Sequence, residues 1–511
     1  KSIGEMNICG LTPQVKDISN NEREYNYMIT PRRGGLGETV LYVNGIEAKR
    51  YKSAQLIKNG SDYRLNIKRS ELNSWFITGQ TNRVSVKAYT AGNDISSRSV
   101  IDDEEGDNKT TAPPNLYAVM IGVSDYKGDE LDLKYAGKDA MDISNAVAVS
   151  SRKLLNTDGK EHVFIYNLNT EKDRSGSPDK NSIRMTLSEI GKKATPNDIL
   201  LIFFAGHGMM SGEKKQFYFL TSDASKATAA DATADVGIST AELTEWMKPQ
   251  NIKAQKRILI FDACNSGQAI RDFVKLGGND QDYVAARDDE KAAQVKAIEK
   301  LNEKSGLFIL SASASNQKAY EMSRYSQGVL TYSLLKAIKQ QPDILDNGKY
   351  LNVSRWFGAA EKTVSELSKE NNIRQQPQIV SNTNFNIGLV DEEVVAKIIL
   401  PPEKPLFAAS NLQNNDESIA ADDLGLSRMI DNSLSALSER GSKGPIAFIS
   451  NTSTPDAYKL SGRYEVKENN ITVKVNVRRG KDVKRFELTG TTGKLIELAA
   501  AIAEEAARVV K

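Results

Sequence analysis

The chain of 511 residues contains two histidines and two cysteines, and one of each directly follows a short apolar run. His207 comes after ILLIFFAG at 199–206, and Cys264 comes after ILIFDA at 258–263. A thiol becomes a strong nucleophile as the thiolate, which a neighbouring imidazolium stabilises. The pair therefore indicates attack by Cys264 on a carbonyl carbon, with His207 as the base that removes the thiol proton.

The two apolar runs must position this pair. Short, β-rich apolar runs closed by glycine are typical of fully buried parallel strands, and ligands of open α/β sheets bind beyond the carboxyl ends of such strands. Glycines beside both residues allow backbone to approach a substrate closely. The alternative is that Cys264 is a small buried hydrophobe and His207 a core histidine. Their matching places at two strand ends beside glycines favour the reactive pair.

The second histidine and the second cysteine are not expected to take part. His162 precedes its strand at 163–168, so a parallel sheet places it at the end opposite to Cys264. Cys9 falls in a β-rich N-terminal region, where we interpret it as a filler residue. Because Cys9 and Cys264 fall in different predicted domains, we expect no disulfide between them.

Asp262 is predicted to lie below the nucleophile. Side chains at positions i and i+2 of a strand share a face, so Asp262 points the same way as Cys264. A carboxylate there attracts a basic substrate side chain and repels an acidic one. Two alternatives are a structural ion pair and a third catalytic residue that holds His207.

Composition restricts the class of protein. Hydrophobic content is 39%, charged content 26%, and 68 basic against 66 acidic residues give a net charge of +2. These values are ordinary for soluble globular proteins and do not indicate a nucleic-acid partner. No apolar stretch reaches the ~18 residues of a membrane span, no signal peptide is visible, and no cofactor motif is expected. Because the chain begins at Lys1, we expect a mature form or a fragment, either cytoplasmic or exported.

Three domains are predicted, at 1–112, 113–395 and 396–511. The first has strand patterns at 39–43, 75–77 and 83–89, with turns at Asn44-Gly45 and Asn59-Gly60, and predicts a small β-sandwich. Acidic residues at 102–108 followed by Pro113-Pro114 have a linker composition. Pro401-Pro402 and the polar run 410–418 mark the next boundary. Beyond it, helices at 427–437 and 493–510 and strands at 458–466 and 471–477 predict a small α/β domain.

The central region alternates strands with helices, which predicts a mostly parallel sheet covered by helices on both faces. The expected strands are 116–123, 163–168, 199–205, 217–221, 258–263 and 307–311. The expected helices are 139–155, 182–194, 239–247, 290–301 and 331–339.

At these residues the sequence resembles the caspase/metacaspase clan of cysteine peptidases. The matching segments, in chain order, are LYAVMIGVSDY at 116–126, LKYAGKDA at 133–140, DILLIFFAGHG at 198–208, DACNSG at 262–267, ILSASASNQKAYE at 309–321 and GVLTYSLL at 328–335. The resemblance implies a caspase-like α/β fold. It also implies His207 as general base, Cys264 as nucleophile, and an oxyanion site at the Gly208 and Cys264 backbone amides.

The same resemblance implies a substrate pocket. Animal caspases carry glutamine two positions before the catalytic cysteine, whereas this chain carries Asp262, as metacaspases do. The resemblance to metacaspases also assigns Asp139 to this acidic pocket. Ala205 occupies the position, two residues before the histidine, at which metacaspases often have serine. The implied activity is cleavage of a protein or peptide substrate after arginine or lysine.

Further family features concern regulation. Many metacaspases bind calcium through paired carboxylates after the histidine strand, but GIST at 237–240 lacks them and Asp223, Asp231 and Asp235 are scattered, so no metal site is predicted. The N-terminal β domain resembles the Ig-like segment that precedes bacterial caspase-like domains, often behind WD-repeat propellers. A recognition domain upstream of this chain is therefore implied.

Two questions remain open from the sequence. The polar segment 268–305 carries seven basic residues that are either sites of self-cleavage or hydrating charges of a surface loop: Arg271, Lys275, Arg287, Lys291, Lys296, Lys300 and Lys304. The main alternative to a peptidase is a catalytically silent caspase-like scaffold or binding module, although a scaffold needs neither Cys264 nor His207. An acyl transferase or ligase would use the same thioester chemistry.

Overall fold

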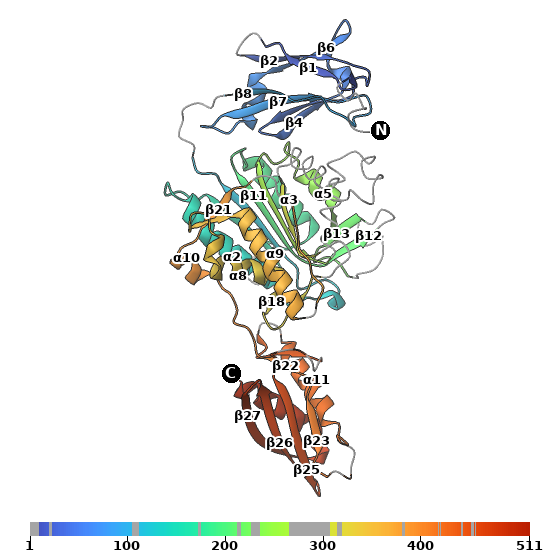
Figure 1. Ribbon diagram of the computed structural model, residues 1–511, viewed down its shortest axis with the longest axis vertical. Helices are drawn as coiled ribbons and strands as arrows, with labels where there is room; N and C mark the ends of the chain where they lie inside the picture. Colours follow the sequence, from blue (N-terminus) through green and yellow to red (C-terminus); the bar gives the residue numbers. More distant parts are fainter. Residues whose placement is uncertain are drawn as a thin grey trace.

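The protein is represented by a computed structural model, and Figure 1 shows three units in a row along its long axis. It describes residues 10–19, 23–104, 112–171, 175–211, 216–225, 236–264, 307–313, 319–371, 373–380, 384–416, 418, 421–440, 443–450, 454 and 456–510. Cys9, the predicted helix at 290–301 and the basic segment 268–305 lie outside these residues. The predicted domain boundaries at 112/113 and 395/396 stay predictions.

The N-terminal unit consists of two four-stranded antiparallel sheets. The first has the order β1 (Gln14–Asp17), β2 (Glu24–Thr30), β6 (Asp62–Lys68), β5 (Ile57–Asn59). The second has the order β4 (Ile46–Tyr51), β3 (Thr39–Val43), β7 (Asn82–Ala88), β8 (Val100–Glu104). Tyr27 and Ile29 of the first sheet share one buried cluster with Leu41 and Val86 of the second. This packing of two inner faces is the sandwich that the sequence predicted.

Within this unit the predicted turn at Asn44-Gly45 is confirmed, whereas one predicted strand and the start of the predicted linker are wrong. Asn44 and Gly45 have φ of 53° and 81°, as a tight β3–β4 turn requires. The predicted strand at 75–77 is wrong, because a 3-10 helix at Asn73–Trp75 occupies its start. The predicted linker also begins too early. Asp102 and Glu104 belong to β8 and accept hydrogen bonds from the Tyr27 and Tyr25 hydroxyls at 2.6 and 2.5 Å.

The central unit is built on a six-stranded sheet whose first five strands are parallel. Its order is β10 (Val163–Asn169), β9 (Leu116–Gly122), β11 (Ile199–Gly206), β15 (Lys256–Ala263), β16 (Leu307–Ser311), β20 (Gln378–Val380). Predicted strand 217–221 is not part of it. It forms β13 (Gln216–Leu220) of a separate antiparallel sheet with β12 (Gly208–Ser211) and β14 (Gly237–Ser239).

Helices cover both faces of this sheet, as Figure 1 shows. Alternate residues of a strand point to opposite faces, and two separate buried clusters follow from this. Leu201 and Phe203 pack with residues of α2 (Ala136–Leu155), α8 (Val329–Gln340) and α9 (Val353–Glu370). Leu200 and Ile202 pack with residues of α3 (Lys180–Lys193) and α5 (Thr240–Trp246). Helix α9 was not predicted.

The C-terminal unit has a four-stranded sheet with two helices on one face. The sheet order is β23 (Asn411–Asn414), β25 (Lys459–Lys467), β26 (Asn470–Arg479), β27 (Asp482–Thr491), and the helices are α11 (Leu426–Ser438) and α12 (Leu495–Val509). A parallel pair, β22 (Leu406–Ala408) and β24 (Ala447–Ile449), lies beside it. Strand β23 shows that the polar run 410–418 is partly folded into the unit rather than only marking its boundary. Strand β27 was not predicted.

No described helix has the length and apolarity that crossing a membrane requires.

Candidate active site

His207 and Cys264 follow two adjacent parallel strands at the same edge of the sheet. Ala205 of β11 is the register partner of Asp262 of β15, and Gly206 is the partner of Ala263. The next residues along the two strands are His207 and Cys264. A Cβ atom on Gly208 would lie 2.3 Å from the Cys264 carbonyl oxygen, so the two backbones are in direct contact here.

The orientation of His207 is fixed by a backbone carbonyl. Its Nε2 atom lies 2.8 Å from the Leu131 carbonyl oxygen. A carbonyl oxygen only accepts hydrogen bonds, so Nε2 carries the hydrogen. In the neutral ring Nδ1 is then unprotonated and available as a base. The contact thus selects the tautomer in which Nδ1 can take a proton.

Tyr126 contacts the same histidine through its hydroxyl and its ring. Its hydroxyl oxygen accepts the His207 backbone N–H at 2.9 Å, and the two ring centres are 5.2 Å apart. Gly206 makes the approach feasible, because its φ is 154° and a Cβ atom there would lie 2.8 Å from the Tyr126 hydroxyl. Few side-chain-bearing residues adopt this backbone conformation. The glycine before the histidine therefore has a steric role.

Cys264 is partly exposed and is not in a disulfide. Its Sγ atom lies 3.7 Å from the Ala319 carbonyl oxygen, within reach of a weak S–H hydrogen bond. Ala319 precedes β17 (Glu321–Met322), so the segment after β16 borders the thiol. Cys264 is thus a partly exposed residue whose sulfur contacts the backbone at Ala319.

Asp139 and Asp262 come from different elements and meet at Gly328. Asp139, in the first turn of α2, accepts the Gly328 backbone N–H at 2.9 Å. Asp262 accepts the backbone N–H and the hydroxyl of Thr331 at 3.1 and 2.7 Å. A Cβ atom on Gly328 would lie within 2.9 Å of both carboxylates. The structure therefore brings the two predicted acidic residues together.

A third carboxylate, Glu321, lies beside this pair and was not singled out from the sequence. It accepts the backbone N–H groups of Lys134 and Tyr135 at 3.0 and 2.9 Å, immediately before α2. We call Asp139, Asp262 and Glu321 the acidic cluster. A lone glutamate within a motif gives no periodic signal, and only the β17–β18 hairpin, with β18 at Gln327–Gly328, brings it to α2.

Burial dominates the electrostatics of the acidic cluster. Burial, then the Asp262 and Glu321 charges, raises the pKa of Asp139 well above its usual range. Burial also raises the pKa of Asp262 to about 6, although the hydrogen bonds from Thr331 act in the opposite direction. The Oδ1 atom of Asp139 is buried and has no hydrogen-bond partner. An unpaired buried acceptor is costly, so this oxygen is suited to a donor brought by a ligand.

The remaining predicted site residues lie around the same edge. Ala205 is buried and packs in the cluster that α2 and α8 cover, on the face toward which Asp262 points. Gly208 begins β12. In the part of the chain that the structure describes, no three His, Cys, Asp or Glu side chains are arranged to hold a metal ion.

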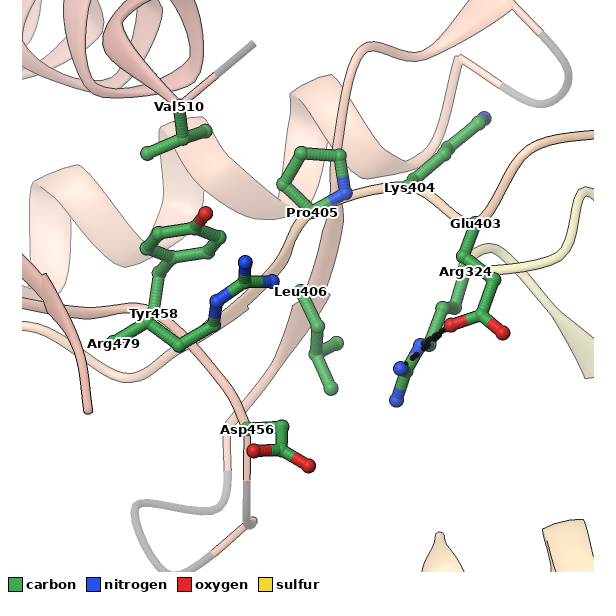
Figure 2. A pocket seen from close by; sticks show the side chains of 9 residues that line it. All are labelled: Arg324, Glu403, Lys404, Pro405, Leu406, Asp456, Tyr458, Arg479 and Val510. Carbon is green, nitrogen blue, oxygen red and sulfur yellow. Dashed lines mark hydrogen bonds and ion pairs between the residues drawn. The ribbon is translucent and has the colours of Figure 1, made fainter. Parts of the chain in front are cut away.

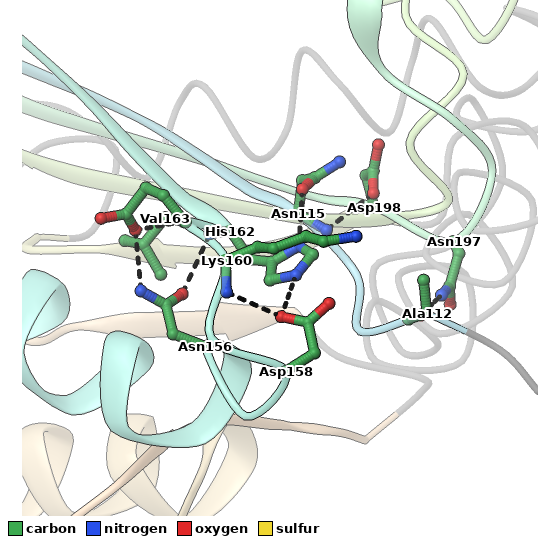
Figure 3. Close-up of polar contacts among 10 residues, drawn as sticks. Ala112, Asn115, Asn156, Asp158, Lys160, His162, Val163, Asn197 and Asp198 are labelled. Carbon is green, nitrogen blue, oxygen red and sulfur yellow. Dashed lines mark hydrogen bonds and ion pairs between the residues drawn. The ribbon is translucent and has the colours of Figure 1, made fainter.

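His162 lies at the opposite end of the sheet, as expected, at the start of β10 (Figure 3). Its Nδ1 atom is 3.0 Å from the Asn115 side-chain oxygen, and its Nε2 atom is 3.0 Å from the Asp158 carboxylate. The Lys160 backbone N–H also donates to Asp158 at 3.0 Å. This histidine therefore holds the turn before β10 and does not face Cys264.

Comparison with known proteins identifies the family of the central unit. The family model of the caspase domain matches residues 115–386, more than half of the chain. Protein GSU0716 from Geobacter sulfurreducens is similar at 15% identity, with 55% of this chain and 97% of that chain covered and a TM-score of 0.32. An uncharacterized protein is similar at 12% identity, covering 21% of this chain and 92% of that chain, with a TM-score of 0.16. A search of curated proteins found no match.

Proposed function

Because this chain belongs to the caspase-domain family of peptidases, we propose that it is a cysteine endopeptidase that cleaves after arginine or lysine. The observation that carries the specificity is the buried, unpartnered Oδ1 of Asp139 beside the Asp262 carboxylate. A substrate guanidinium or ammonium offers both the missing donor and the opposite charge. An aspartate side chain offers neither and would meet three carboxylates.

The proposed first half of the reaction forms a thioester. Nδ1 of His207 takes the Sγ proton of Cys264, and the thiolate attacks the carbonyl carbon of the scissile bond. The oxygen that becomes negative is placed at the Gly208 and Cys264 backbone amides, where such donors have their largest effect. When the tetrahedral intermediate collapses, the C–N bond breaks and His207 gives its proton to the leaving amine.

The second half hydrolyses the thioester. His207 Nδ1 removes a proton from water as the oxygen attacks the thioester carbon, and the C–S bond breaks. The thiolate leaves with the proton returned to the Cys264–His207 pair, and the acid product departs. In this proposal the Leu131 carbonyl keeps the same tautomer through both halves, since it holds Nε2–H throughout.

The test uses fluorogenic peptides that end in arginine, lysine or aspartate. We expect turnover after arginine and lysine only, with kcat lowered more than about a thousandfold in Cys264→Ala and His207→Ala. The chain offers matched controls, Cys9→Ala and His162→Gln, which should retain activity. Turnover after aspartate alone would contradict the acidic pocket. If Cys264→Ala keeps the full activity of the wild type, or if no peptide is cleaved, the scaffold would be favoured.

A peptidase that cleaves after arginine or lysine can also cleave basic segments of its own chain. The segment 268–305, outside the described residues, carries the seven basic residues named above. We propose that the active protein cleaves itself there. Intact mass spectrometry of the wild type and of Cys264→Ala tests this, because identical masses would reject self-processing.

A further inference from the structure

Gln375 is a buried polar residue that the proposed reaction does not use. It lies between α9 and β20 in the chain and is 1% exposed. Its Oε1 atom accepts the Tyr320 backbone N–H at 3.0 Å, and its backbone carbonyl oxygen accepts the hydroxyl of Ser368, a residue of α9, at 3.2 Å. Gln375 therefore joins the end of α9 to the segment 319–321, whose last residue begins β17.

The segment 319–321 contacts the thiol at one end and the acidic cluster at the other. The Ala319 carbonyl oxygen lies 3.7 Å from Cys264 Sγ. The Glu321 carboxylate accepts two backbone N–H groups immediately before α2, the helix that carries Asp139. Because the two contacts are made by residues only two positions apart, a displacement of this short segment would change both of them.

Other contacts hold the β17–β18 hairpin that continues from this segment. At its base the Val329 N–H donates to the Tyr320 carbonyl oxygen at 3.0 Å. At its tip Arg324 donates to Glu403 Oε2 from Nε and Nη2 at 3.2 and 2.7 Å, and Figure 2 shows this pair. Neither contact involves the Tyr320 N–H, for which the structure shows Gln375 as the acceptor.

The amide at position 375 is not explained by packing. Among the described residues, Gln375 Nε2 is a buried donor without a hydrogen-bond partner, and such a donor destabilises a fold. An apolar side chain of similar size would remove this donor, but it would leave the Tyr320 N–H without its acceptor. The bond to Tyr320 therefore accounts for the amide.

We propose that Gln375 is a positioning residue, which through the Tyr320 N–H holds Ala319 against the thiol and Glu321 against the start of α2. The proposal rests on the proposed function, because both contacts belong to that site. A hydrogen bond that the protonated thiol donates is lost when the thiolate forms, so the place of the Ala319 carbonyl affects how readily Cys264 ionises. Gln375 thus acts on the thiol and on the acidic cluster through one segment.

The first test measures ionisation of the thiol and does not require turnover. In a Cys9→Ala background Cys264 is the remaining cysteine of the chain, and its alkylation by iodoacetamide is followed against pH by mass spectrometry. Gln375→Leu should move the midpoint of this profile to lower pH. Below the midpoint the rate should rise about threefold or more, as expected for the loss of one hydrogen bond. An unchanged midpoint, with or without a higher plateau from greater access, would overturn the proposal.

The second test is steady-state cleavage of an arginyl peptide. Gln375→Leu should lower kcat/KM about tenfold or more, because small displacements in a site are costly. Gln375→Glu keeps an oxygen acceptor at the same length and should restore most of the loss. Gln341→Leu is the matched control, since Gln341 follows α8 and donates to Thr363 at 3.3 Å, and it should retain activity. Equal losses in Gln375→Leu and Gln375→Glu would overturn the role of the acceptor.

The two tests separate this inference from the proposed function. If the wild type cleaves no peptide, the proposed function fails, and the alkylation profile still decides whether Gln375 positions the segment at the thiol. If the wild type cleaves the peptide and Gln375→Leu equals it in both tests, the inference fails and the proposed function stands. Thermal unfolding checks that each variant is folded. Should Gln375→Leu not fold, Gln375→Asn replaces it, because asparagine withdraws the acceptor by one methylene group.

Discussion

Gly328 and Asp262 are packed so closely that position 328 has no room for a side chain. A Cβ atom built on Gly328 would lie 2.7 Å from Asp262 Oδ2 and 2.9 Å from Asp139 Oδ2. The glycine has an extended backbone, so the requirement is steric and not conformational. It allows two buried carboxylates to approach the same residue, Asp139 through the Gly328 N–H and Asp262 beside it, where it accepts from Thr331.

Replacing Gly328 by alanine should therefore impair use of the acidic cluster. We expect kcat/KM for an arginyl peptide to fall about tenfold or more, because displacements of an ångström in a site can cost up to about a hundredfold. Steady-state kinetics measures this. Gly358→Ala in α9 is the matched control, since nothing lies within 4 Å of its Cβ position. Equal activity of the two variants would contradict the steric role.

Asp262 should make the stability of the protein depend on pH. Its folded pKa of about 6 exceeds the unfolded value of 3.8, so between these values the folded state binds more protons. Stability from this group is present below pH 4 and lost as the pH rises through 6. Asp262→Asn should thus unfold like the wild type at pH 4 and be more stable at pH 7, by roughly 2–3 kcal/mol. Denaturant unfolding at both pH values measures the difference.

Asp391, a carboxylate whose pKa is lowered by folding instead of raised, provides the control for this prediction. Hydrogen bonds from Lys153 and from the Val394 amide lower the pKa of Asp391, which caps helix α10 (Glu392–Lys397). Its stabilising effect is present above the unfolded pKa and lost as the pH falls through the lower folded value. Asp391→Asn should therefore be less stable than the wild type at pH 7. If both variants were more stable, or both less stable, than the wild type at pH 7, the opposite pKa shifts assigned to Asp262 and Asp391 would be contradicted.

Substrate affinity should follow the charge of the acidic cluster. As the pH rises through about 6, Asp262 loses its proton and the attraction for a basic side chain grows. We expect KM for an arginyl peptide to fall across this range and to become insensitive to pH in Asp262→Asn. Measuring KM separately from kcat distinguishes this from the titration of catalytic groups. An unchanged pH dependence in the variant would reject it.

The Tyr126 hydroxyl is expected to position His207. Tyr126→Phe removes the acceptor of the His207 backbone N–H, and an unsatisfied buried donor costs about 1–3 kcal/mol. We expect a lower kcat with little change in KM, because the base moves while the acidic cluster does not. Tyr117→Phe is the control, since Tyr117 lies at the start of β9 and stacks on Phe164. A similar loss of kcat in both variants would argue against positioning.

Arg257 should be a large contributor to stability. It is 1% exposed and donates to the backbone carbonyls of Ala254, Met247 and Ile252. Arg257→Leu would leave these buried acceptors unpaired, and we expect the free energy of unfolding to fall by about 3 kcal/mol or more. Arg152→Leu, at an arginine whose side chain is 47% exposed, should change it by less than about 0.5 kcal/mol. Denaturant unfolding of both variants compares them.

Sequence patterns alone determined the central sheet and the pair that follows it. Apolar runs bounded by glycine located β11 and β15, and the parallel arrangement required that His207 and Cys264 share an edge and that His162 lie at the other. This worked because the side-chain period of a strand and the direction of parallel strands are local properties. Strand β13 was located but assigned to the wrong sheet, since pairing partners are not encoded locally.

Only the tertiary structure decided what surrounds the pair. The Leu131 carbonyl, the Tyr126 hydroxyl and Glu321 come from segments that no periodic pattern distinguishes. The burial of Arg257 near the start of β15 is explained only by its three backbone carbonyl partners. The physical reason is that these contacts join residues distant in the chain, whose polar groups are paired by the packing of elements and not by local sequence.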